Sequence, residues 1–196
     1  IKGSLYLTNS TVKSLGKLKF VGGDFIASSF IKSLGELKEV HNYLNLYNCY
    51  TLESLGKLEK VRDLNIAGCI NLKDLGNLKK ITGSLCLVDC LNLTDIGEHL
   101  EIINGFFKGA NSGLISLGVL KEVKDFLNLE GSKKIKSLGK LKKVSGNVFL
   151  SYCKLLEDLG DLETIGYEKR IYLDGTKITK SYIMKFKPQL LKNCVW

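Results

Sequence analysis

The stretch GKLKKVSGNVFLSYCKLLEDLG, residues 139–160, recurs in near-copies along almost the whole chain. It carries aliphatic residues at regular intervals, a cysteine at Cys153 and a glycine at each end. That glycine stands at Gly16, Gly35, Gly56, Gly76, Gly97, Gly118, Gly139 and Gly160. Apart from two slightly shorter steps, of 19 and 20 residues, the spacing is 21 residues. A fixed period in this range indicates a solenoid, in which each repeat packs only on its neighbours.

Each repeat contains a short segment in which apolar and polar residues alternate, the pattern of a strand buried on one face. These segments are residues 42–48, 63–68, 84–89, 126–131 and 147–152. One repeat separates successive strands, which allows a crossover and makes the strands parallel. The return segment, x-L-x-x-L-G-x-L-x-x-V, is too short for a full helix. The predicted fold class is therefore a repeat solenoid with a parallel β-sheet on its concave face. Its convex side is expected to consist of turns, 3₁₀ pieces or short strands.

Two segments are expected: an array of about eight 20–21-residue repeats over residues 1–180, and a capping segment over residues 181–196. Ser181 is expected to cap a short helical turn that folds Ile183, Phe186, Leu190 and Leu191 over the last coil. A separate amphipathic interaction helix is the alternative. Residues 1–16 match the second half of a repeat, without a polar cap. Because solenoid ends need capping, we expect a longer chain or a neighbouring domain at that end.

Four of the six cysteines, Cys49, Cys69, Cys90 and Cys153, occupy one position in four repeats. A disulfide-stapled domain would space its cysteines irregularly through loops. We therefore expect reduced, buried thiols stacked in a ladder, rather than disulfides or a metal site, and an intracellular, cytoplasmic location.

The formal net charge is +9, yet only Arg62 and Arg170 are arginines. Arginine supplies the bidentate forks that read phosphates and guanines, so its scarcity argues against nucleic acid as the partner. The lysines fall on the turns and outer edge with glutamates among them, which is typical of a solvated exterior. Attachment of that edge to an acidic partner or to nucleic acid is the alternative. No run approaches the roughly 18 apolar residues of a membrane span.

The run LNIAGCINLKDLGNLKKI, residues 64–81, resembles the L-x-L-x-x-(N/C)-x-x-L pattern of leucine-rich repeat proteins, with Cys69 at the Asn/Cys position. In most repeats three residues separate the valine from the strand leucine, where that family usually has two. The longer form is similar to the β-helical L domains of growth-factor receptors, which is the nearest alternative. Either resemblance implies a right-handed solenoid with a parallel sheet.

Residues that alternate with the inward aliphatics point outward onto one shared face. In the irregular fifth repeat, EHLEIINGFFKGANSGLI, we assign Gly105, Phe107 and Gly109 to it. The outward set contains seven aromatics, four acids and one arginine, but no lysine. Aromatic rings beside amides are typical of interfaces, although they also pack against cross-strand neighbours. The candidate partner-binding residues are Tyr6, Tyr43, Asn45, Tyr47, Asn65, Phe107, Phe126, Asn128, Phe149, Arg170 and Tyr172.

Catalytic and metal-binding patterns are not assembled. His41 and His99 stand near turns, away from a serine or cysteine nucleophile. Cys86 and Cys90 lack the second pair that a zinc site needs. We therefore expect no enzyme activity, cofactor or metal, and predict a module that recognises another protein or a peptide through its concave aromatic face. The alternatives are a targeting or sensor domain of a larger enzyme or receptor, and a viral or phage inhibitor of a host protein.

Overall fold

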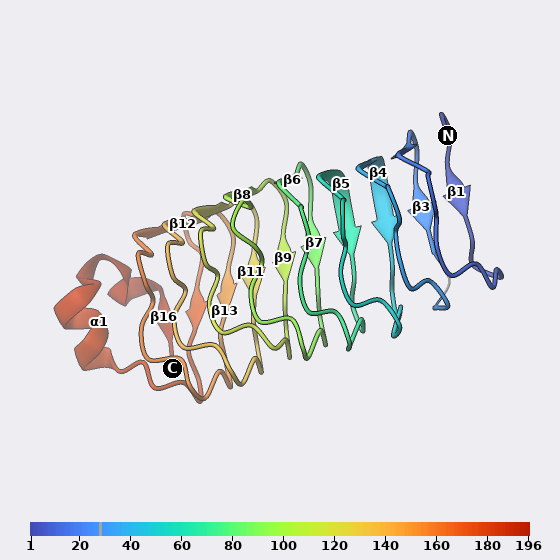
Figure 1. Cartoon of the computed structure of the whole chain (residues 1–196). Coiled ribbons are helices and arrows are strands. Elements are labelled where there is room, and N and C mark those ends of the chain that lie inside the picture. The colour runs from blue at the N-terminus through green and yellow to red at the C-terminus, as the bar shows by residue number, and fades with distance from the viewer. Residues whose placement is uncertain (28) are drawn as a thin grey trace.

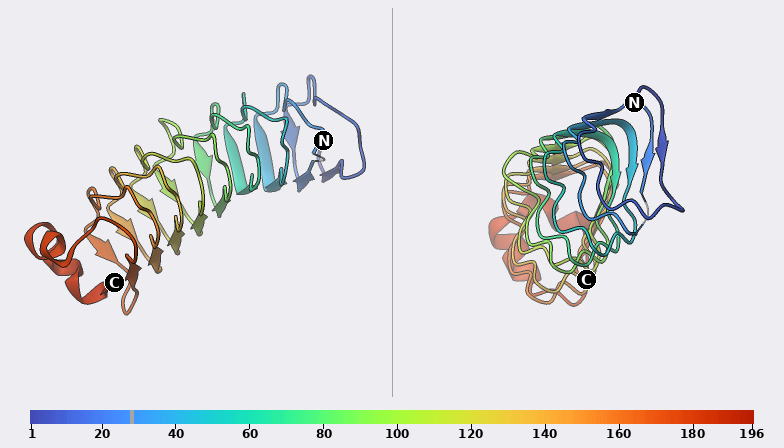
Figure 2. Two further views of the ribbon diagram at one scale, coloured as in Figure 1. Left: turned by 90° about the horizontal axis from the view of Figure 1, so that it is seen from below. Right: turned by 45° about the vertical axis from the view of Figure 1, so that its right-hand side comes forward.

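The structure, a computed structural model, describes residues 1–27 and 29–196. The chain winds into a parallel β-solenoid of about nine turns, which confirms the predicted fold class. Successive coils stand side by side along a rod (Figure 1) and nest inside one another when viewed obliquely along it (Figure 2). Residues one repeat apart in sequence are therefore neighbours in space.

A first ladder of short parallel strands runs the length of the rod, where alternation in the sequence predicted it. Its strands pair in register through buried residues, for example Leu44 with Leu64 and Leu127 with Val148. They are β1 (Leu5–Tyr6), β3 (Phe25–Ile26), β4 (Glu39–Asn45), β5 (Lys60–Asn65), β7 (Leu85–Cys86), β9 (Phe107–Lys108), β11 (Leu127–Asn128), β13 (Val148–Phe149), β15 (Ile171–Tyr172) and β16 (Cys194–Val195).

A second ladder lies on the return segment. For this segment the sequence allowed turns, 3₁₀ pieces or short strands, and the structure has short strands. It pairs the repeat's valine or isoleucine from coil to coil, for example Val123 with Val144. The early halves of β4 and β5 belong to it, so these two strands join the ladders. The others are β2 (Phe20–Val21), β6 (Lys80–Ile81), β8 (Ile102–Ile103), β10 (Glu122–Val123), β12 (Lys143–Val144) and β14 (Thr164–Ile165).

The third side of each coil is the turn at the S-L-G or D-L-G triplet. The serine or aspartate oxygen accepts a hydrogen bond from the glycine N–H two residues later, at 3.0 Å for Ser137 and 2.8 Å for Asp74. Such side-chain-to-backbone bonds favour tight turns. The glycines that follow have positive φ, 61° at Gly139 and 58° at Gly76. This turn geometry explains why nearly the same triplet recurs in each repeat.

The core is one continuous cluster of aliphatic side chains between the three sides. Each fully buried aliphatic side chain contributes about 1.5–3 kcal/mol before conformational entropy is deducted. In the coil after Gly139 these are Leu141, Val144, Val148, Leu150, Leu156 and Leu159. A single coil leaves half of this surface open, so the coils are stable only as a stack.

A ladder of thiols and hydroxyls crosses this core. Cys49, Cys69, Cys90 and Cys153 are fully buried, as expected, and all six cysteines are free. The thiols of Cys69, Cys90 and Cys153 each donate to a backbone carbonyl on the preceding coil at 3.0 Å. In the fifth coil, whose repeat lacks the cysteine, Ser112 takes the ladder position. Its Oγ lies 3.2 Å from that of Ser132, which donates to the Gly109 carbonyl at 2.9 Å.

The C-terminal segment covers the last coil with helix α1 (Lys180–Phe186) and 3₁₀ helix η1 (Pro188–Asn193), and β16 adds a final strand to the first ladder. Helix α1 begins earlier than expected, because Thr179 rather than Ser181 caps it by accepting the Tyr182 N–H at 3.1 Å. Ile183 and Leu190 are buried, whereas Phe186 is 56% exposed and does not join the core.

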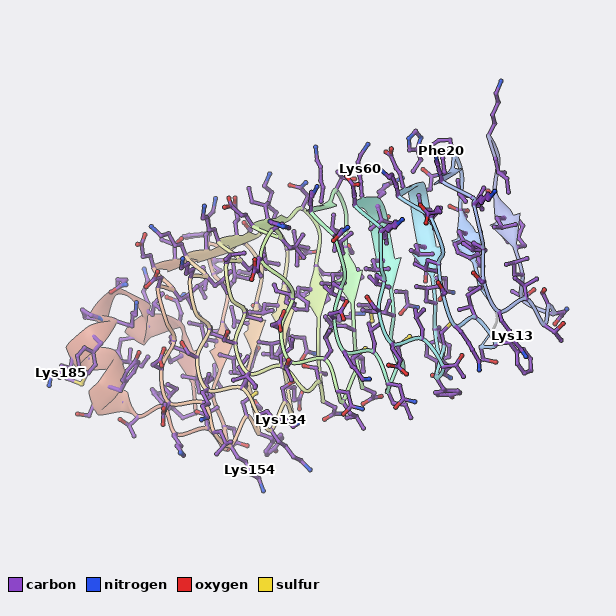
Figure 3. The ribbon with its side chains drawn as sticks, viewed as in Figure 1. Lys13, Phe20, Lys60, Lys134, Lys154 and Lys185 are labelled. Carbon is purple, nitrogen blue, oxygen red and sulfur yellow. The ribbon has the colours of Figure 1, made fainter. Side chains whose placement is uncertain are left out.

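Lysines and glutamates pair across neighbouring coils on the outside. Lys57 lies 2.7 Å from Glu36, and Lys121 lies 2.8 Å from Glu101. In Figure 3, Lys60 projects from one edge of the rod and Lys134 and Lys154 from the opposite edge. Exposed pairs of this kind contribute about 0–1 kcal/mol each, so they fit a solvated exterior. No helix in the described part of the chain is long and apolar enough to cross a membrane.

Two turn glycines provide a matched test of coil stacking. Gly56 and Gly76 have nearly the same φ, 59° and 58°, so alanine costs each about 1–2 kcal/mol of backbone strain. A Cβ at Gly56 meets nothing within 4 Å, whereas one at Gly76 overlaps the Gly56 carbonyl on the preceding coil. We expect Gly76→Ala to lower the free energy of unfolding by about 1–3 kcal/mol more than Gly56→Ala, in urea titrations followed by circular dichroism. Equal losses would contradict the stacking.

Candidate functional site

The candidate site is the outward face of the first ladder, here called the first-ladder face. Ten of the eleven predicted residues lie on it with side chains partly or fully exposed: Tyr6, Tyr43, Asn45, Tyr47, Asn65, Phe126, Asn128, Phe149, Arg170 and Tyr172. They fall into two groups along the rod. Tyr43, Asn45 and Asn65 lie together on β4 and β5, and Phe126, Phe149 and Tyr172 lie together beside β11, β13 and β15. Ser28, which the alternation in the sequence also assigns to this face, lies outside the described residues.

The eleventh residue, Phe107, was assigned wrongly. Its side chain is fully buried, in register with Leu85 and Leu127. Its neighbours Phe106 and Lys108 are half-buried instead and line a hollow of the first-ladder face, so this face does carry a lysine. The signal was present in the sequence, because three residues separate Ile103 from Phe107, as they do Val123 from Leu127.

Phe107 is accommodated in the core because the next inward position is Gly109. A Cβ at Gly109 would lie 3.1 Å from Leu87 and 3.2 Å from the Phe107 ring. The ring thus fills the space that a leucine at this position would take. The coil that contains Phe25 pairs a large and a small residue in the same way: Phe25 is fully buried, and the next inward residue is the small Ala27.

Four aromatic rings form a row on successive coils of the C-terminal half. Phe106 stacks on Phe126 with centroids 5.2 Å apart, and Phe149 stacks on Tyr172 at 5.0 Å. Phe126 and Phe149 meet edge to face at 6.4 Å. Contacts of this kind contribute about 0.5–1.5 kcal/mol per pair beyond burial. The row therefore stabilises the stack and also holds each ring in one orientation.

Several polar residues of the first-ladder face bond to backbone on the next coil. Asp63 Oδ1 accepts the Ser84 N–H at 2.7 Å, and Ser84 Oγ accepts the Phe106 N–H at 3.3 Å. Asn147 Oδ1 accepts the Arg170 N–H at 2.9 Å. These bonds satisfy N–H groups at the start of each ladder strand. The acids and amides at this position are thus already engaged by the fold.

The outward amides two residues further along each strand bond to neighbouring side chains or to their own strand, not to the backbone of the next coil. Asn65 Nδ2 donates to the Tyr43 hydroxyl at 3.2 Å and lies 3.3 Å from Asn45 Oδ1. Asn128 Oδ1 accepts the Glu130 N–H at 2.9 Å, and its NH₂ group has no hydrogen-bond partner among the described residues. Asn128 therefore offers two free donors beside the aromatic row.

A hollow of about 410 Å³ opens on the first-ladder face between the two groups. It is lined by Tyr43, Asp63, Leu64, Asn65, Ser84, Cys86, Phe106 and Lys108. Tyr43 and Phe106 occupy the same outward position on coils that are three apart. On the two coils between them this position holds Asp63 and Ser84, whose side chains are short. The hollow therefore exists because two consecutive coils lack a ring at this position.

The titratable side chains in the described parts of the chain do not gather into a metal-binding cluster. No group of three or more His, Cys, Asp or Glu there could hold a metal ion. His41 lies 3.1 Å from Glu39 and packs edge-on against Phe20. Burial raises the pKa of the Cys153 thiol to about 12 and raises that of Cys90 further, so both stay protonated.

Comparison with known proteins assigns no family to the chain. No protein family matches its sequence, no curated protein matches it, and no solved structure matches its fold. The functional argument therefore starts from the geometry of the first-ladder face.

The burial of the cysteines predicts their reactivity towards N-ethylmaleimide at about pH 8. Cys86 and Cys194 are partly exposed, but burial raises the pKa of Cys194, so Cys86 should react first. The four ladder cysteines should react only after unfolding. Peptide mass spectrometry over a time course measures each site, and Cys86→Ser should remove the fast phase alone. Labelling of Cys90 or Cys153 at the rate of Cys86 would contradict the closed stack.

Proposed function

We propose that the chain is a non-enzymatic recognition module that binds another protein or a peptide along the first-ladder face. The observation that carries this proposal is the row of Phe106, Phe126, Phe149 and Tyr172, four half-buried rings on successive coils of a regular sheet. Aromatic side chains are enriched at protein interfaces and supply much of their binding energy.

The stacking within the row favours recognition as well as stability. Each ring packs against a neighbouring ring, face to face in two pairs and edge to face between Phe126 and Phe149, so the rings are held in fixed positions. A side chain that is already held in place loses little conformational entropy when a partner binds. The free NH₂ group of Asn128 adds hydrogen-bond donors beside the rings. A rigid apolar strip with polar groups at its margin is the composition of an interface core and its rim.

We infer further that the repeat is related to leucine-rich repeats. The Cys69 thiol supports this, because it bonds to the Leu46 carbonyl from the Asn/Cys position of that pattern. The second ladder supports the L-domain-like alternative, since it places a strand on a further side of each coil. Both relationships are compatible with recognition through the first ladder.

The proposal is tested by placing a photo-crosslinking amino acid at Phe149, with Tyr167 as the matched control position. Tyr167 is 89% exposed and lies just after β14 of the second ladder. Crosslinking is carried out in extracts of the source cells, and proteins captured at position 149 but not at 167 are purified. We expect at least one of them to bind the intact chain directly in calorimetry.

Binding of that purified partner is then compared between the intact chain and the triple variant Phe126→Ala, Phe149→Ala, Tyr172→Ala. We expect a loss of about 100-fold or more, because removing interface aromatics typically costs above 1 kcal/mol each. Tyr167→Ala should bind like the intact chain, and circular dichroism should show that the triple variant keeps its sheet. A folded triple variant with unchanged affinity would reject the first-ladder face as the site.

A further inference from the structure

We propose that the hollow between Tyr43 and Phe106 is a specific subsite for an aromatic group that carries a carboxylate, with Lys108 as the residue that pairs with the carboxylate. This rests on the proposed function, because the occupant would be an aromatic residue of the protein partner beside an acidic group or its C-terminal carboxylate. It goes further by naming the chemistry recognised and the residues that recognise it.

The dimensions of the hollow fit one aromatic group. Register places Asp63 and Ser84 between Tyr43 and Phe106, so the two rings are three coils apart, about 14 Å at roughly 4.8 Å per coil. The volume of about 410 Å³ lies at the small end of the roughly 300–1,000 Å³ range of ligand sites. It is too small for a folded element and large enough for one side chain with its backbone.

One wall of the hollow offers a free ring face. Phe106 stacks on Phe126 with an interplanar angle of 13°, which occupies the face turned toward the C-terminal coils. Phe106 lines the hollow and Phe126 does not, so the other face of Phe106 is turned toward the empty space. Leu64 adds apolar surface. An incoming ring can therefore stack on Phe106 and extend the aromatic row by one member.

Lys108 supplies the charge. Its Nζ lies 4.9 Å from the centre of the Phe106 ring and 5.6 Å from that of Phe126. Within residues 1–27 and 29–196 no carboxylate lies within ion-pair distance of it, although eight other lysines pair with glutamates. Cation–π contacts of this kind are weaker than pairing with a carboxylate when both are partly desolvated. The ammonium lies beside this stacked pair of rings, and the Lys108 side chain, which lines the hollow, has no counter-ion among the described residues.

The one acid of the hollow does not cancel this charge. Asp63 Oδ2 lies 3.5 Å from Arg62 Nε, and Oδ1 accepts the Ser84 N–H at 2.7 Å. Its charge is thus offset by an arginine outside the lining. The hydroxyl of Ser84 accepts from the Phe106 N–H and keeps its own hydrogen free to donate. Lys108 and Ser84 together favour an anionic oxygen, and the neutral amide of Asn65 does not oppose it.

The test uses three small probes and nuclear magnetic resonance of the isotope-labelled intact chain. N-acetylphenylalanine carries the ring and the carboxylate, its amide lacks the charge, and N-acetylglycine lacks the ring. We expect N-acetylphenylalanine to bind with a dissociation constant of about 1 mM and to shift the signals of Asn65, Cys86 and Lys108. The amide should bind at least about fivefold more weakly, and N-acetylglycine should cause no saturable shift.

The variants separate charge recognition from general ring binding. Lys108→Gln should bring the acid and the amide to equal affinity, whereas Lys124→Gln, the same charge change at an exposed lysine of the next coil, should leave the preference intact. Bound N-acetylphenylalanine should also slow the alkylation of Cys86. The proposal is overturned if acid and amide bind equally to the intact chain, if the preference survives Lys108→Gln, or if shifts appear away from the hollow.

This outcome is independent of the partner experiment. A partner that depends on Phe126, Phe149 and Tyr172 but binds equally well to Lys108→Gln supports the recognition module and rejects the carboxylate subsite. A preference for N-acetylphenylalanine without any protein partner supports the subsite and rejects the module as proposed.

Discussion

Everything in this structure depends on the hydrogen bonds between coils. Each ladder residue bonds to a residue one repeat away, so equivalent positions of the sequence share one environment along the rod. This forces the inward strand positions to be apolar in every coil and the turns to have a similar backbone shape. Gly76 shows the constraint directly, because its missing Cβ leaves room for the Gly56 carbonyl. A coil that broke the register would lose bonds on both of its sides.

The features that recur in every repeat could be predicted from the sequence, because hydrogen bonding between coils requires the same residue types at equivalent positions. The parallel ladder, the aliphatic core, the buried cysteines and the turn glycines all follow from it. The sequence could not decide between turns, 3₁₀ pieces and strands for the second ladder, because most of its strands are two residues long and too short to show alternation. The N-cap of α1 was misplaced because Thr179 and Ser181 are both good caps, and only the geometry of the last coil decides between them.

The error at Phe107 has a specific cause in the fifth coil. This coil gains a residue between Gly97 and Leu100, compared with the two-residue step from Gly139 to Leu141, and loses one between Ser112 and Leu114, compared with Cys153 to Leu156. The two changes cancel, so the glycine period stays at 21 and hides the shift between them. Phe107 also looked like a surface aromatic, because a ring in the core needs the compensating Gly109. As a result, Phe106 and Lys108, which complete the aromatic row and the hollow, were missed.

The aromatic row and the hollow are formed by the same outward position on successive coils. The hollow therefore lies at one end of the row, and the first-ladder face has a direction. Where this position holds aromatic rings on consecutive coils, the rings pack against one another, face to face or edge to face. Where it holds Asp63 and Ser84, a gap remains and exposes one ring face at its end. An extended chain advances about 3.3 Å per residue and the coils about 4.8 Å, so three residues of such a chain match two coils. A partner lying along the rod could therefore place a ring in the hollow and a second apolar side chain, several residues further on, against the row. A partner lying across the rod could reach only one of them.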